Sequence, residues 1–132
     1  MNDEMITGRV PTAAGVAAFV TNSGTREEFP TGALRDTEVG KGAFDCIPYA
    51  PLKRLADLYQ RGAVKYGKHN WQLGIDEGRC YSSMIRHAMQ ALAVFQGHAG
   101  EEMQREDHLA AVVFNAFCLM FYQETGLAPS TR

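Results

Sequence analysis

The fold is decided by one stretch of the chain, residues 109–122, which reads LAAVVFNAFCLMFY and is apolar at nearly every position. A helix that is apolar on every side is buried on every side. In a chain of 132 residues, such a helix lies at the centre of the protein or at a subunit interface, and we expect both. The helix should begin near Glu102, reach Glu124 and end at Gly126, with Pro129 beyond it.

Amphipathic periodicity predicts two further helices before this stretch. The first begins near Pro51, a residue suited to a first helical turn, and ends at Gly67. The second runs from about Arg79 to Gln96 and ends at Gly97. No segment alternates apolar and polar residues for long enough to predict a strand. The expected fold class is therefore all-α, a compact bundle of about three main helices.

The sequence before the helices has a different composition. Residues 1–40 contain five glycines and two prolines, and their one apolar stretch, Ala13 to Val20, suits a short helix or a strand equally. We expect residues 1–30 to form an irregular or flexible arm, residues 31–126 the helical domain, and residues 127–132 a tail.

The composition excludes several classes of protein. A net charge of −2 and a pI near 6.1 argue against a general nucleic-acid binder, which needs a basic excess. No apolar run approaches the length of a membrane span, and the acidic start is unlike a secretory signal. Three cysteines without CxxC spacing indicate neither a disulfide framework nor a zinc knuckle. We expect a small cytoplasmic domain that forms an oligomer.

Two basic segments are candidate nucleotide contacts. Arg35 and Lys41 precede the first helix and are suited to clamp phosphates, although an ordinary solvated loop is the alternative. The run Gly62 to Trp71 ends the first helix, and its contact residues are Lys65 for phosphate, Tyr66 or Trp71 for stacking on a base, and Asn70 for the base edge. The alternative is that the lysines complement the helix dipole and Trp71 fills the core.

Two more candidates lie inside the predicted helices. Arg86 and His87 are adjacent on the second helix, where a lone histidine is more often structural than a ligand. Asp57 lies in the middle of the first helix, and a surface ion pair with Lys53 or Arg61 is its simplest explanation.

An acidic segment opens the last helix. Glu101 and Glu102 suit a first helical turn. Asp107 and His108 directly precede the most apolar stretch of the chain, where polar groups need partners. Together with Glu106, this combination of carboxylates and imidazole suits a divalent metal ion.

Taken in order, these motifs resemble the phage dATP/dGTP diphosphohydrolase N-terminal domain family. The resemblance covers roughly residues 31–126, and its most specific part is the GA-x-KYG-x-x-NW run. The matching segments are Gly32–Asp36, Gly40-Lys41, Asp45, Ile47-Pro48, Gly62–Gly67, Asn70-Trp71, Gly74, Arg86-His87, His108-Leu109 and Asn115.

The resemblance implies a compact helical domain, often encoded by a phage and then located in the host cytoplasm. It also implies cleavage of purine (deoxy)nucleoside triphosphates to monophosphate and pyrophosphate. Related MazG-like all-α nucleotide pyrophosphohydrolases are dimers or tetramers that hold Mg²⁺ on an ExxE…ExxD pattern. The present chain lacks that pattern on the expected helices. We expect a homodimer or homotetramer, with no nucleic-acid or membrane partner.

The mechanism that follows is a hypothesis with three sets of residues. The metal ligands would be Asp57, His87, Asp107 and His108, with Asp57, Asp107 and His108 as the catalytic residues. The phosphate contacts would be Arg35, Lys41, Lys65 and Arg86, and the base contacts Tyr66, Asn70 and Trp71. Because two of the four metal ligands are histidines, Mn²⁺ or another transition metal suits the site better than Mg²⁺. The alternatives are a nucleotide-sequestering protein without catalysis and a purely structural interaction domain.

Overall fold

The computed structural model describes residues 6–11 and 17–127 and divides the chain into two units, Met1–Phe44 and Asp45–Arg132. Residues 1–5 and 12–16 of the predicted arm, and most of the predicted tail, lie outside the described residues. The predicted domain limits at residues 30 and 126 stay predictions. The two units are described one at a time.

The described residues of the first unit contain four strands, whereas the sequence suggested a strand only as one of two alternatives for Ala13 to Val20. Strands β1 (Ile6–Pro11) and β2 (Ala17–Thr21) pair antiparallel, and so do β3 (Arg26–Glu28) and β4 (Leu34–Asp36). Strands β1, β2 and β3 differ from the irregular arm expected for residues 1–30, and β4 differs from the helical structure expected from residue 31 onward. Strands β3 and β4 have three residues each, too few to show a period of two. The turn between them depends on Gly32, whose φ of 86° favours glycine.

The second unit is helical, and the first two predicted helices are confirmed. They are α1 (Tyr49–Tyr66) and α2 (Glu77–Phe95). Gly67 ends α1 as predicted, and its backbone N–H donates to the carbonyl of Ala63. Two short 3₁₀ helices flank α1 in the sequence: η2 (Phe44–Cys46) precedes it and η3 (Asn70–Leu73) follows it.

The third predicted helix is two helices. Helix α3 (Glu101–Gln104) is a single turn, and α4 (His108–Thr125) begins after a break at residues 105–107. The expectation of one continuous helix from Glu102 was wrong because Asp107 starts a new helix as its N-cap. Its carboxylate accepts a hydrogen bond from the backbone N–H of Ala110 at 3.2 Å, and an N-cap residue leaves the helical conformation. The predicted end at Gly126 is confirmed.

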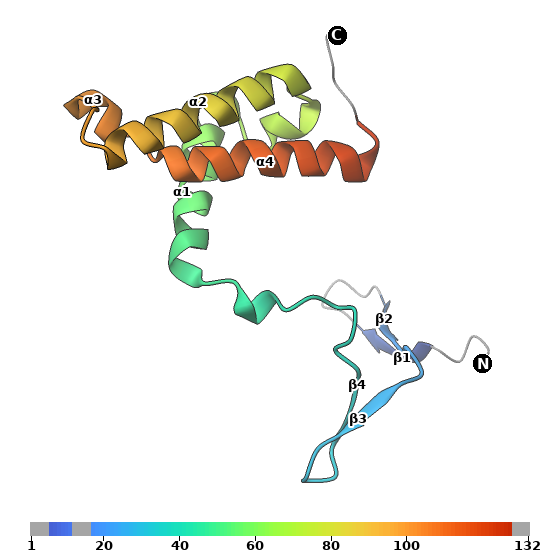
Figure 1. Ribbon diagram of the computed structural model, residues 1–132. Helices are drawn as coiled ribbons and strands as arrows, with labels where there is room; N and C mark the ends of the chain where they lie inside the picture. The colour runs from blue at the N-terminus through green and yellow to red at the C-terminus, as the bar shows by residue number, and fades with distance from the viewer. Residues whose placement is uncertain (1–5, 12–16, 128–132) are drawn as a thin grey trace. The chain divides into compact units, whose positions relative to one another are not determined.

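The core of the second unit lies between α2 and α4, which run side by side in opposite directions (Figure 1). Its fully buried side chains are Cys80, Cys118 and Tyr122. The hydroxyl of Tyr122 donates to the carbonyl of Trp71 at 2.7 Å and accepts from the backbone N–H of Ile75 at 2.9 Å. This one side chain therefore attaches the loop between α1 and α2 to α4.

Helix α4 is buried on one side only within the chain. Its opposite side exposes Leu109, Val113, Phe117 and Met120, each between 41% and 58%. Within the chain α4 is therefore buried on one side, and the subunit interface expected for this helix stays a prediction. Helix α2 also exposes an apolar stripe, formed by Tyr81, Ile85, Met89 and Leu92. No helix of the described residues is long and apolar enough to cross a membrane.

Candidate functional site

A cleft of about 1460 Å³ opens in the second unit, lined by residues of α1, η3, α2, α4 and the break before α4. Eight of the eleven residues predicted for the site line this cleft. They are Asp57, Lys65, Tyr66, Asn70, Trp71, Arg86, His87 and Asp107. His108 is buried directly behind the wall, where its ring contacts that of His87.

The cleft has an excess of positive charge. Seven arginine and lysine side chains line it against three carboxylates. The basic residues are Arg54, Arg61, Lys65, Lys68, Arg79, Arg86 and Arg105. A concave surface of one charge sign raises the local concentration of oppositely charged ligands, so this cleft is suited to a polyanion despite the net charge of −2.

The aromatic residues predicted to hold a base have different surroundings. Tyr66 is 61% exposed at the end of α1, with the ammonium of Lys65 lying 5.0 Å from the centre of its ring. Trp71 packs edge-on against Tyr59 and Phe121, with ring centres 5.7 and 4.8 Å apart. Trp71 thus packs against the core, as its alternative interpretation predicted, while it also lines the cleft.

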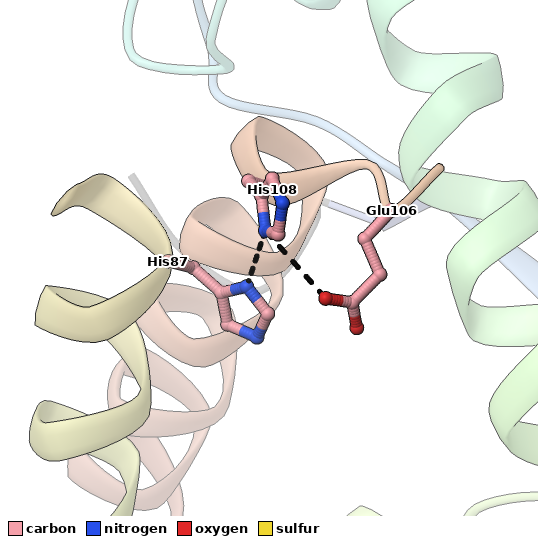
Figure 2. Close-up of side chains that lie close together, drawn as sticks. All are labelled: His87, Glu106 and His108. Carbon is pink, nitrogen blue, oxygen red and sulfur yellow. Dashed lines mark hydrogen bonds and ion pairs between the residues drawn. The ribbon is translucent and has the colours of Figure 1, made fainter. Parts of the chain in front are cut away.

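His87 and Glu106 line the cleft, and His108 lies directly behind them (Figure 2). His87 belongs to α2, His108 is the first residue of α4, and Glu106 lies in the break between α3 and α4. The Nδ1 atoms of the two histidines are 3.0 Å apart, and Oε2 of Glu106 is 3.7 Å from Nδ1 of His108. Both histidines are buried, whereas the Glu106 side chain is 64% exposed.

The backbone determines the protonation of this pair. Nε2 of His108 lies 2.6 Å from the carbonyl oxygen of Met103, which only accepts, so Nε2 carries a proton, and in the neutral tautomer Nδ1 is the nitrogen with the lone pair. His87 then donates its Nδ1–H to that lone pair. Burial lowers the pKa of His87, and the nearby charge of Arg86 lowers it further. Burial therefore favours the neutral form of His87, and a neutral imidazole is the form that binds a metal ion.

The two predicted aspartate ligands are engaged elsewhere. Asp107 accepts two hydrogen bonds from the Arg54 guanidinium, which, together with the bond from Ala110, hold the pKa of Asp107 below its ordinary value. Asp57 pairs with Lys53 at 2.5 Å. Neither belongs to the group formed by His87, Glu106 and His108.

Glu106 belonged to the acidic segment that suggested a metal ion, but the predicted ligand set left it out. The capping interpretation of that segment applied to Glu101 and Glu102. The signal that identifies Glu106 is the break at residues 105–107, which ends α3 and turns Glu106 toward the histidines (Figure 2).

The remaining predicted contacts lie in the first unit. Lys41 forms an ion pair with Asp36 at 2.9 Å, and Arg35 lies in β4. Every residue that lines the cleft comes from the second unit. A role for Arg35 and Lys41 in phosphate binding therefore stays a prediction.

The fold and the cleft define a mostly helical protein with a cleft rich in basic side chains. The family model described as dATP/dGTP diphosphohydrolase, N-terminal, matches residues 31–129. The match covers most of the chain, so the protein belongs to this family, and the resemblance seen in the sequence is confirmed. Comparison with curated proteins and with solved structures gave no match.

Proposed function

We propose that the cleft hydrolyses purine (deoxy)nucleoside triphosphates to monophosphate and pyrophosphate with the help of a divalent metal ion. The observation that carries this proposal is the cleft itself, where basic side chains face a wall of imidazole and carboxylate. Membership in the family described as dATP/dGTP diphosphohydrolase, N-terminal, supports this reaction and this class of substrate. A bound divalent ion, Mg²⁺ or Mn²⁺, would supply charge neutralisation at the phosphates and a water of lowered pKa.

The side chains of the cleft have separate roles in this proposal. Lys65 and Arg86 bind the triphosphate, since electrostatic stabilisation is the main contribution that a protein makes to phosphoryl chemistry. Tyr66, which is exposed, stacks on the base in this proposal, and Asn70, which lines the cleft, binds the edge of the base. The proposal also includes Asp57, Asp107 and His108 as the acidic and imidazole groups around the reacting phosphate.

A second candidate function is nucleotide binding without catalysis. Two of the three carboxylates that line the cleft, Asp57 and Asp107, are held in ion pairs with Lys53 and Arg54. Carboxylates engaged in this way are less available to a metal ion. This observation favours a protein that sequesters a nucleotide or a nucleotide-derived signal.

The proposal includes a homodimer or homotetramer. Adjacent helices α2 and α4 expose apolar stripes. Exposed apolar patches of this kind mark surfaces for association. In this proposal the apolar surface is covered by the same surface of a second copy of the chain.

Product analysis tests the proposed activity. The protein is incubated with each dNTP and NTP in Mg²⁺ or Mn²⁺, and the products are separated. Monophosphate and pyrophosphate from dATP or dGTP support the enzyme, and tight binding of intact nucleotide supports the sequestering protein. If the protein neither hydrolyses nor binds any nucleotide, both proposals are overturned.

A matched pair of variants ties the result to the cleft. Arg86→Gln should weaken nucleotide binding by about tenfold or more, as expected for loss of a charged hydrogen bond worth about 1.5–3 kcal/mol. Arg26→Gln removes the same charge from β3, outside the lining of the cleft, and should leave binding unchanged. Equal effects of the two substitutions would place the nucleotide elsewhere.

A further inference from the structure

We infer that His87, Glu106 and His108 bind a single first-row transition-metal ion, of which Zn²⁺ is the test case, in preference to Mg²⁺. The inference deepens the proposed function, because it assigns the class of metal and a ligand set that includes Glu106. Only the role of the ion in hydrolysis rests on that function. Binding of the ion is argued from the three side chains alone.

The spacing of the three side chains suits one ion. Each offers a ligand atom, and these atoms all lie within 4.8 Å of one another. Two nitrogen ligands at about 2.1 Å from an ion lie about 3.0–3.4 Å apart for angles between a right angle and a tetrahedral one. The Nδ1 atoms of His87 and His108 are 3.0 Å apart. Glu106 is exposed and extends from a loop, so its carboxylate is free to close the remaining distance.

The surroundings of His108 are those of an oriented ligand. Metal-binding histidines usually donate their second ring N–H to a carbonyl or carboxylate, which determines the tautomer and the orientation of the ring. His108 makes this contact with the Met103 carbonyl. Nδ1 of His108 therefore lies next to Nδ1 of His87 and the carboxylate of Glu106 (Figure 2). An ion bound there would replace the hydrogen bond between the two rings, with the His87 proton on Nε2.

The chemistry of the ligands selects the class of metal. Imidazole suits zinc, copper, iron and nickel, whereas Mg²⁺ prefers oxygen ligands and retains several waters. Two imidazoles and one carboxylate form a set used by zinc in catalytic sites, where the fourth position stays open. Because His87 and Glu106 both line the cleft, an open position would be accessible to a ligand in the cleft.

A purely structural histidine pair explains less of this arrangement. The hydrogen bond between the rings would satisfy two buried nitrogens without any carboxylate nearby. It gives no reason for an exposed glutamate to lie 3.7 Å from the same Nδ1 atom. The two interpretations differ in the expected effect of changing Glu106, which is exposed and contributes nothing to the core.

Calorimetric titration of the full chain with Zn²⁺ and Mg²⁺ tests the inference. We expect one Zn²⁺ per chain, bound about 100-fold more tightly than Mg²⁺. Glu106→Gln should weaken Zn²⁺ binding about tenfold or more, and His87→Ala should weaken it further. The controls are Glu102→Gln, a nearby carboxylate outside the group, and His98→Ala, an exposed histidine, and both should bind Zn²⁺ as the unchanged protein does.

The outcomes separate this inference from the proposed function. Circular dichroism of each variant shows whether it is folded, and Glu106→Gln keeps the test valid if His87→Ala does not fold. Failure to bind Zn²⁺, equal affinity for Mg²⁺, or no effect of Glu106→Gln overturns the metal site. Hydrolysis is measured separately. Zn²⁺ binding without hydrolysis contradicts only the proposed activity, and hydrolysis without Zn²⁺ binding contradicts only the metal inference.

Discussion

Arg54 and Asp107 lie 53 residues apart in the chain and join α1 to the start of α4 through two parallel hydrogen bonds. Nε of Arg54 donates at 2.9 Å and Nη2 at 2.6 Å to the two carboxylate oxygens. The same carboxylate caps α4 through Ala110. Asp107 therefore starts a helix and holds together two sides of the cleft, and these two functions can be separated by substitution.

Asp107→Ala should lower the free energy of unfolding by about 1–2 kcal/mol, because it removes both the helix cap and the ion pair. Asp107→Asn should cost about 0.5 kcal/mol, since asparagine caps helices as well as aspartate does. Urea denaturation measures both values. Equal losses in the two variants would show that capping by this side chain does not contribute to stability.

Stability should depend on pH through the same carboxylate. Hydrogen bonds from Arg54 lower the pKa of Asp107 in the folded protein below its ordinary value of 3.8. A carboxyl group with a lowered folded pKa stabilises the protein above its unfolded pKa and loses this contribution as pH falls through the folded pKa. The difference in free energy of unfolding between the protein and Asp107→Asn should therefore be largest at about pH 5–7 and decline below about pH 4. A difference that stays constant with pH would contradict the ion pair.

The sequence predicts the helices of this protein well, because each has a local signal. The stripes of α1 and α2 repeat with the helical period, and Gly67 and Gly126 mark helix ends through their backbone freedom. The break before α4 was missed because a capping aspartate inside an acidic run resembles continued helix. The β3–β4 hairpin was missed because its short strands show no alternation of apolar and polar residues. The hairpin is defined instead by the pairing of its two strands and by the turn at Gly32.

The sequence predicted which residue types line the candidate site. It predicted less well which of their side chains pair with one another. Lys65, Arg86 and His87 were chosen for their chemistry, and all three line one cleft. Whether a carboxylate is available is decided by contacts distant in sequence, as in the engagement of Asp107 by Arg54. Residue spacing in the sequence does not predict a contact between side chains so far apart in the chain.

The hydroxyl of Tyr122 should contribute measurably to stability. It is 1% exposed and bonds two backbone groups of the loop that contains Trp71. Tyr122→Phe leaves both groups without this partner, which should cost about 1–3 kcal/mol. Trp71 is the one tryptophan of the chain, so its fluorescence follows the unfolding. Tyr81→Phe, at a tyrosine that is 46% exposed, is the control and should be neutral. Similar losses in both variants would contradict the assigned role.

The exposed side of α4 should hold copies of the chain together. Phe117 lies in the middle of this stripe and is 43% exposed in the single chain. A glutamate placed there would be buried without a partner in an apolar interface, at a cost of several kcal/mol. Light scattering should therefore give a multiple of 14.5 kDa for the protein and the mass of a single chain for Phe117→Glu. Val64→Glu, at an exposed position of α1, should leave the oligomer intact. A protein that is already monomeric would contradict the proposed assembly, and so would an oligomer that survives Phe117→Glu.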